Sequence, residues 1–110
     1  MIRRWVAQNP NTSPETLRIL ATDWDSWVRA GAANNPNTSP EIISEILSIL
    51  ATDEDVDVRY CVALNPNTSP EILSVLTTDE DKGVRYWVAR NPNATELIRR
   101  LVLMTNAQEK

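Results

Sequence analysis

The tripeptide Asn-Pro-Asn recurs along the whole chain, and no other feature narrows the choice of fold as far. It begins at Asn9, Asn35, Asn65 and Asn91, so successive copies are 26, 30 and 26 residues apart. Three of the copies continue as Thr-Ser-Pro-Glu. A repeat of about 20 to 50 residues is typical of solenoids, in which each unit buries its apolar side against its neighbours. We therefore predict a stacked repeat protein.

Each repeat is predicted to hold two short helices, one on either side of the turn. The segment after the turn, called A, begins in the first copy with Thr12-Ser13-Pro14, and either Thr12 or Ser13 suits the N-cap. The segment before the turn, called B, is apolar at its first and fifth positions, which share one face of a helix. B is short enough to be partly 3₁₀. The apolar i, i+3 pairs of A are Leu17/Leu20, Leu47/Leu50 and Leu73/Leu76.

These helices predict a single all-α domain of about four two-helix repeats over residues 1–110. We expect a half-repeat at 1–10, repeats at about 11–36, 37–66 and 67–92, a C-terminal capping helix at 93–105, and a frayed tail at 106–110. The second A segment has four extra residues at 42–45, about one helical turn. This insertion predicts a protruding turn near Ile42 and Ile43.

The pattern Val-Arg-x-x-Val-Ala-x-Asn-Pro-x-x-x-Pro-x-x-Leu-x-x-Leu, clearest at 58–79 and 84–92, resembles the leucine-rich repeat variant family. The resemblance extends over essentially the whole chain and implies a right-handed superhelix of alternating α and 3₁₀ helices. Some members carry a cysteine-rich iron–sulfur segment, which a chain with Cys61 as its one cysteine cannot form. HEAT-like repeats are the nearest alternative, but they lack the Asn-Pro turn. The family predicts a fold far better than a function.

Composition excludes several functional classes. A net charge of −4 disfavours nonspecific attraction to nucleic acid or to an anionic membrane. The 110 residues include no histidine and one cysteine, so we expect no metal, no cofactor and no disulfide. No apolar run is long enough for a membrane span or a signal peptide, and a cytoplasmic location is expected.

Charged and amide residues also recur at fixed positions. Asp25, Asp55 and Asp81 each stand four residues before an arginine, in the order that favours an ion pair on a helix. We interpret these pairs with Arg29, Arg59 and Arg85 as structural, with a partner-binding face or a metal site as alternatives. The asparagines at 9, 35, 65 and 91 are expected to form a hydrogen-bonding ladder along one edge.

The four tryptophans divide into two groups. Trp5 and Trp87 occupy equivalent B positions and are expected to be core or semi-core. Trp24 and Trp27 occupy positions where other repeats carry Glu54, Glu80, Asp57 and Gly83. Exposed aromatic residues mark recognition sites. The alternative is that Trp24 or Trp27 fills space beside Gly31, where other copies have larger residues.

The favoured function is a non-catalytic scaffold for an unidentified protein partner. The candidate contacts are Trp24, Trp27, Ile42, Ile43, Arg29, Arg59 and Arg85. A nucleic-acid-binding solenoid ranks second because tryptophan and arginine can stack on bases, although the chain is acidic. Self-association through the terminal helices is a third possibility, and an enzyme is disfavoured because no base or activated nucleophile is visible.

Overall fold

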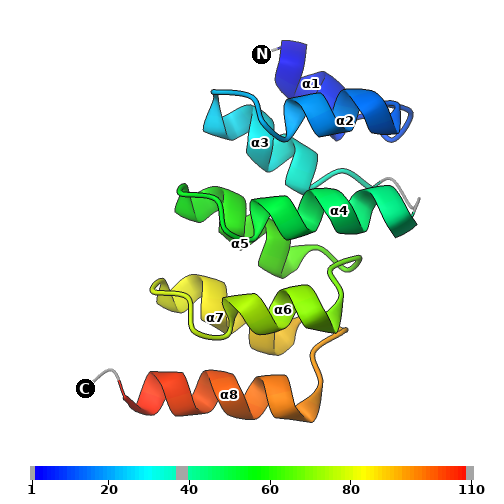
Figure 1. Ribbon diagram of the computed structural model, residues 1–110. Coiled ribbons are helices and arrows are strands. Elements are labelled where there is room, and N and C mark those ends of the chain that lie inside the picture. Colours follow the sequence, from blue (N-terminus) through cyan, green and yellow to red (C-terminus); the bar gives the residue numbers. More distant parts are fainter. Residues whose placement is uncertain (1, 37–39, 109–110) are drawn as a thin grey trace.

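A computed structural model describes residues 2–36 and 40–108 of the chain, and within these ranges all regular structure is α-helical. The helices are α1 (Ile2–Gln8), α2 (Pro14–Leu20), α3 (Ser26–Ala33), α4 (Pro40–Leu50), α5 (Val56–Leu64), α6 (Pro70–Leu76), α7 (Lys82–Arg90) and α8 (Glu96–Ala107) (Figure 1). The predicted all-helical repeat solenoid is confirmed. The turn at 37–39, which precedes the second A segment, lies outside the described residues.

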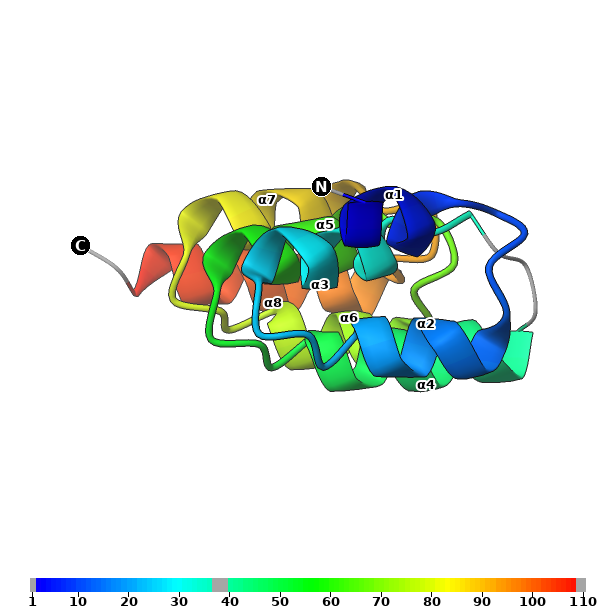
Figure 2. The ribbon, with the colours of Figure 1, turned by 90° about the horizontal axis from the view of Figure 1, so that it is seen from above.

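The helices form two layers. The B helices α1, α3, α5 and α7 pack on one another in chain order, and the A helices α2, α4 and α6 form the second layer (Figure 2). The stack measures 42 × 24 × 16 Å, with α1 at one end and α8 at the other (Figure 1). In an elongated stack of this kind each repeat packs mainly against the repeats next to it.

A serine caps the first A helix, and the threonine before it holds the turn. Ser13 caps α2 by accepting from the Thr16 N–H, and Pro14 follows in the first turn, which decides between the two caps expected from the sequence. The hydroxyl of Thr12 donates instead to the Val6 carbonyl at the end of α1. Thr68 repeats that bond to Val62 at 2.7 Å. The threonine therefore ties the turn to the preceding B helix.

The B segments are α-helices, which corrects the expectation of partly 3₁₀ geometry. Hydrogen bonds of the tighter i→i−3 type appear at their C-terminal ends, where Asn65 N–H donates to Val62 and Asn91 N–H donates to Val88, both at 3.2 Å. Helices commonly tighten in the last turn in this way. The following proline explains the stop, since the asparagine before it is held in an extended conformation.

One apolar core runs through the stack. The leucine pairs predicted for the A helices are all buried. The first and fifth positions of the B segment are also buried in the three copies that lie in α3, α5 and α7. The core members at those B positions are Val28, Ala32, Val58, Val62, Val84 and Val88. In α1 the equivalent residues Ile2 and Val6 are exposed. The sequence pattern therefore identifies the core everywhere except at the first helix.

The inserted turn in α4 contributes to the core and does not protrude. Helix α4 has 11 residues where α2 and α6 have 7. Ile43 is only 3% exposed, and the half-buried Ile42 packs against the core. The same turn brings Glu45 to Arg18 of α2, with two N–O distances of 3.0 Å. The expectation of a protruding turn is wrong, and the inward packing leaves little of Ile43 for the partner contact expected of Ile42 and Ile43.

The capping helix is longer than predicted. Helix α8 continues to Ala107, so residues 106 and 107 are helical and not frayed. Thr95 caps its N-terminus, and the helix packs against both α6 and α7. Residues 109 and 110, the end of the predicted tail, lie outside the described residues.

Candidate functional site

The arginines of the B helices form cross-repeat ion pairs. Arg29 Nε lies 2.7 Å from Asp53 Oδ2, and Arg59 Nε lies 2.8 Å from Asp79 Oδ2. Arg3 of α1 makes the same contact with Asp23 at 2.9 Å. The predicted pairing of each arginine with the aspartate four residues before it is therefore wrong. Arg3, Arg29 and Arg59 each bind the aspartate of the next loop along the stack.

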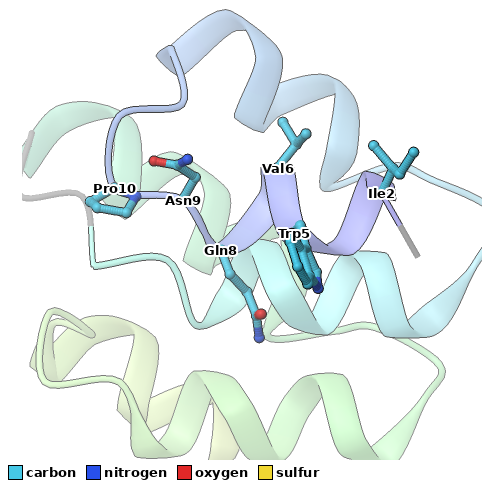
Figure 3. A pocket seen from close by; sticks show the side chains of 6 residues that line it. All are labelled: Ile2, Trp5, Val6, Gln8, Asn9 and Pro10. Atoms are coloured by element: carbon cyan, nitrogen blue, oxygen red, sulfur yellow. The ribbon is translucent and has the colours of Figure 1, made fainter.

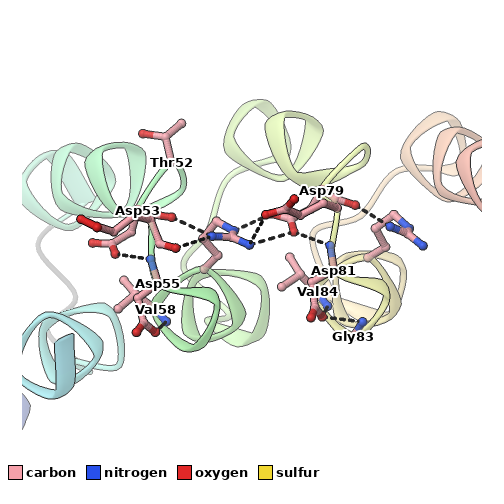
Figure 4. Close-up of polar contacts among 12 residues, drawn as sticks. Thr52, Asp53, Asp55, Val58, Asp79, Asp81, Gly83 and Val84 are labelled. Carbon is pink, nitrogen blue, oxygen red and sulfur yellow. Dashed lines mark hydrogen bonds and ion pairs between the residues drawn. The ribbon is translucent and has the colours of Figure 1, made fainter.

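The aspartates that were expected to pair with arginine cap the helices instead. Asp55 Oδ1 accepts from the N–H groups of Asp57 and Val58, at the start of α5. Asp25 and Asp81 cap α3 and α7 in the same way. Figure 4 shows the caps formed by Asp55 and Asp81 together with the bonds of Asp53 and Asp79. In each Asp-x-Asp loop the first carboxylate thus joins two repeats, and the second starts a helix.

Burial removes the arginine column from the surface. Arg85 is 1% exposed, Arg59 is buried, and Arg29 is half-buried. The hydrogen bond to Asp53 raises the pKa of Arg29, and the hydrogen bond to Asp79 raises the pKa of Arg59. Each guanidinium also donates to a carbonyl of the preceding loop; for Arg59 that acceptor is Asp53. The next repeat thus covers most of the surface through which Arg29, Arg59 and Arg85 were expected to contact a partner.

A ladder of asparagines runs along the edge that carries the turns. Asn35 Nδ2 donates to Ala7 and Asn9 carbonyls at 2.6 and 3.0 Å. Asn91 Nδ2 donates to Ala63 and Asn65 carbonyls at 2.8 and 3.0 Å. Asn65 donates to Ala33 at 2.7 Å. Three of the four asparagines therefore bind the last turn of the preceding B helix, as the ladder hypothesis requires.

Helix α8 ends both ladders with different residues. Arg99 Nε donates to the Ala89 carbonyl at 3.2 Å, the position that an asparagine would occupy in a further repeat. Asn106 Oδ1 accepts from Arg85 Nε at 2.8 Å, where earlier repeats use an aspartate. The sequence analysis missed both roles. No periodic signal marks them, because Arg99 and Asn106 make the bonds of the repeated asparagine and aspartate from positions in α8 that do not align with those residues.

Trp24 and Trp27 are exposed, at 82% and 57%. Arg3 lies over the Trp24 ring with Cζ 5.5 Å from its centroid, and Arg4 lies over the Trp27 ring at 4.3 Å. Such contacts hold a cation on the electron-rich face of the indole. We call these four side chains the tryptophan–arginine surface. It joins α1 to the loop and first turn of α3.

The space beside Gly31 is taken by α1 and not by a tryptophan. A Cβ added at Gly31 would lie 3.1 Å from Ala7 Cβ and 3.3 Å from the Arg4 carbonyl oxygen. The glycine therefore allows close packing of α1 on α3. The alternative in which Trp24 or Trp27 fills a vacancy there does not describe this structure.

A cleft of about 200 Å³ opens beside Trp27. Its walls are Arg4, Ser26, Trp27, Ala30, Asn34, Asp57 and Cys61. Burial raises the pKa of the Cys61 thiol, and a hydrogen bond with Asn34 opposes that rise. Within the described residues Arg4 Nε is buried and has no hydrogen-bond partner. The cleft thus combines the apolar side chains of Trp27 and Ala30 with the guanidinium of Arg4, whose Nε–H has no acceptor within the described residues.

Trp5 and Trp87 occupy equivalent positions but different environments. Trp87 is half-buried, with its ring centroid 6.3 Å from that of Tyr60 on the preceding B helix. Trp5 is 78% exposed. The expectation of a core or semi-core position is therefore met by Trp87 and wrong for Trp5. No described element lies on the outer side of α1 to cover it (Figure 1).

Across residues 2–36 and 40–108, no three His, Cys, Asp or Glu side chains gather to hold a metal ion. No described helix has both the length and the apolar character needed to cross a bilayer.

Comparisons with curated proteins and with solved structures give no match to this chain. A family model does match its beginning. The matched segment includes α1, the first turn and α2, and its motif recurs in the later repeats. The resemblance inferred from the sequence is confirmed over residues 2–25, which match the leucine rich repeat variant family.

Proposed function

We propose that the protein is a non-catalytic binding module that recognises a protein partner through the tryptophan–arginine surface. The observation that carries this proposal is the exposure of two tryptophans, at 82% and 57%, in columns that the other repeats fill with acidic residues or glycine. Exposed indoles have a hydration cost that is relieved when a partner covers them. Tryptophan and arginine also dominate the energetics of protein interfaces.

The arrangement suggests what the partner offers. Arg3 is already paired with Asp23, whereas Arg4 stacks on Trp27 and has a buried donor without an acceptor in the described residues. A carboxylate of the partner is the group that a guanidinium binds best. We therefore expect a segment that brings an acidic side chain to Arg4 and an apolar side chain to the cleft beside Trp27.

Nucleic acid has weaker support. A single-stranded nucleic acid needs a basic groove that follows its backbone, as well as stacking aromatic residues. The repeated arginines could have formed such a groove, but Arg29 and Arg59 are bound to aspartates. The chain also has a net charge of −4. The favourable stacking residues therefore lack the electrostatic surface that nucleic-acid binding requires.

The test uses the full chain as the target of a random peptide display selection. Selected peptides are synthesised, and their dissociation constants are measured for the wild type and for the Trp24→Ala, Trp27→Ala double variant. The matched control is Ile49→Ala with Val75→Ala, because both side chains are exposed on A helices.

We expect the double variant to bind at least about tenfold more weakly, while the control stays within about twofold. Far-ultraviolet circular dichroism checks that all variants remain folded. Equal binding by the wild type and the double variant would show that the tryptophans are not the contact. Salt-sensitive binding of a single-stranded oligonucleotide, tighter than that of any selected peptide, would favour the nucleic-acid alternative.

A further inference from the structure

The outer face of α1 is an exposed apolar surface at the end of the stack. Ile2 is 79% exposed, Trp5 is 78% exposed, and Val6 is also exposed. Their i, i+3, i+4 spacing places them on one side of the helix. They border a hollow of about 510 Å³ that Gln8, Asn9 and Pro10 complete. Figure 3 shows Trp5, Val6 and Ile2 along α1, with Asn9 and Pro10 in the turn that follows.

The rest of the stack shows what kind of surface this is. The corresponding side of α3 is packed against α1, where Ala7 and Gln8 approach Gly31. On α7, Trp87 lies against Tyr60 of α5. The asparagine ladder also starts here without a preceding rung, since Asn9 Nδ2 has no acceptor within the described residues. The α1 face is therefore a stacking surface of the solenoid on which no described element stacks.

This face has no charge of its own. All six residues that border the hollow are uncharged, although the protein has a net charge of −4. The two arginines of α1 are held elsewhere, Arg3 by Asp23 and Arg4 over Trp27. Two identical faces can therefore meet without the like-charge repulsion that opposes most contacts between copies of one protein.

The opposite end of the stack is a poor match for it. There Arg99 and Asn106 of α8 already occupy the positions of the next rungs. The hollow between α7 and α8 includes Arg90 and Arg99. Stacking α1 of one copy on α8 of another would press these cations against an uncharged face, at a desolvation cost.

We propose that two copies of the chain associate head to head through their α1 faces, around a twofold axis. The face has both a protruding side chain and a hollow, as a self-complementary interface requires, so Trp5 of each copy enters the hollow beside Pro10 of the other. The 24 × 16 Å end of the stack has a cross-section of about 400 Å², near half of a standard interface per partner, so the dimer is weak. This inference is independent of the proposed partner binding.

Sedimentation equilibrium tests the proposal, with the full chain at concentrations from about 10 µM to 1 mM, the range in which so small an interface is expected to associate. Trp5→Glu places a charge in the face. The matched control is Met104→Glu, because Met104 is also an exposed apolar side chain, on α8. We expect a monomer–dimer equilibrium for the wild type, at least tenfold weaker association for Trp5→Glu, and no change for Met104→Glu.

Three results would each overturn the head-to-head dimer. In the first, the wild type stays monomeric at the highest concentration. In the second, the Trp5→Glu variant dimerises as well as the wild type. In the third, the wild type forms species larger than a dimer, and Met104→Glu abolishes them. The last result would indicate head-to-tail stacking. The Trp24→Ala, Trp27→Ala double variant should still dimerise, so failure of the proposed partner binding is distinguishable from failure of this inference.

Discussion

Replacing Asn91 by aspartate tests whether the asparagine ladder joins the repeats. Asn91 is 3% exposed, and its Nδ2 donates to two carbonyls of the preceding repeat, Ala63 and Asn65. Its Oδ1 accepts from the Asn93 N–H within the turn. Aspartate has nearly the same shape and keeps the turn bond, but it has no donor at neutral pH. Asn91→Asp therefore removes only the bonds between repeats and places a carboxylate oxygen against two carbonyl oxygens.

The expected cost follows from these contacts. Two hydrogen bonds are lost, at about 1 kcal/mol or more each, and the Ala63 carbonyl loses its donor, whereas the Asn65 carbonyl keeps the bond from the Thr68 N–H. Burial of the new charge adds to this, so we expect the free energy of unfolding to fall by about 3–5 kcal/mol. A domain of this size is stable by roughly 5–15 kcal/mol, so the effect is large. Urea unfolding followed by circular dichroism at 222 nm measures it.

Asn9→Asp is the matched control. Asn9 Oδ1 accepts from the Asn11 N–H, as in the other turns, and the residue is exposed. Because its Nδ2 has no acceptor in the described part of the chain, the same substitution should change stability by less than about 0.5 kcal/mol. If Asn91→Asp were as stable as the wild type, the ladder would not hold the repeats together. If both variants lost equal stability, the cause would be a charge in the turn.

Three other substitutions or measurements test the packing between repeats. Arg59→Met leaves the buried Asp79 without its cation and should lower the free energy of unfolding by about 3–5 kcal/mol. Arg3→Met removes the half-exposed pair with Asp23 and should lower it by less than about 1 kcal/mol. Urea titration of both variants measures the difference. Gly31→Ala sets a Cβ 3.1 Å from a methyl carbon of α1, so we expect a lower melting temperature and faster amide exchange in α1, despite the better helix propensity of alanine. Because burial raises the pKa of Cys61, less thiolate forms at pH 8, and iodoacetamide should alkylate the folded chain more slowly than the urea-unfolded chain.

The fold could be predicted because the repeat period directly encodes stacking. Leu17 and Leu73 stand at the same step after their turns, Leu47 follows its turn by four residues more because of the insertion, and all three are fully buried. The same logic located the asparagine ladder. A residue that recurs in every turn must satisfy the same local need in each repeat, and the exposed backbone groups of a turn define that need. The bounds of α8 were less certain because a capping helix has no second copy to compare with.

The arginine partners could not be predicted because two aspartates recur with the same period. Asp55 is four residues before Arg59 along the chain, whereas Asp79 is twenty residues after it and is adjacent only once the repeats stack. Sequence spacing alone favours the local pair.

Equivalence in sequence also fails at the ends of a stack. Trp5 and Trp87 occupy the same position of the B segment, yet one is 78% exposed and the other packs against Tyr60. The position faces the preceding B helix, so its burial depends on a neighbour and not on the residue itself. A column of identical residues therefore predicts identical environments only for repeats that have neighbours on both sides.

Periodicity also indicates where binding can occur on such a molecule. The recurring arginines, the first aspartate of each loop and three of the four ladder asparagines are bound to an adjacent repeat, so a partner could reach these groups only if the stack opened. The residues that remain available are those that break the repeat. Trp24 and Trp27 replace acidic residues or glycine in one unit, and they have no counterpart elsewhere. We therefore expect a function specific to this chain to depend on the residues that break the repeat, and the tryptophan–arginine surface is exposed along the side of the stack.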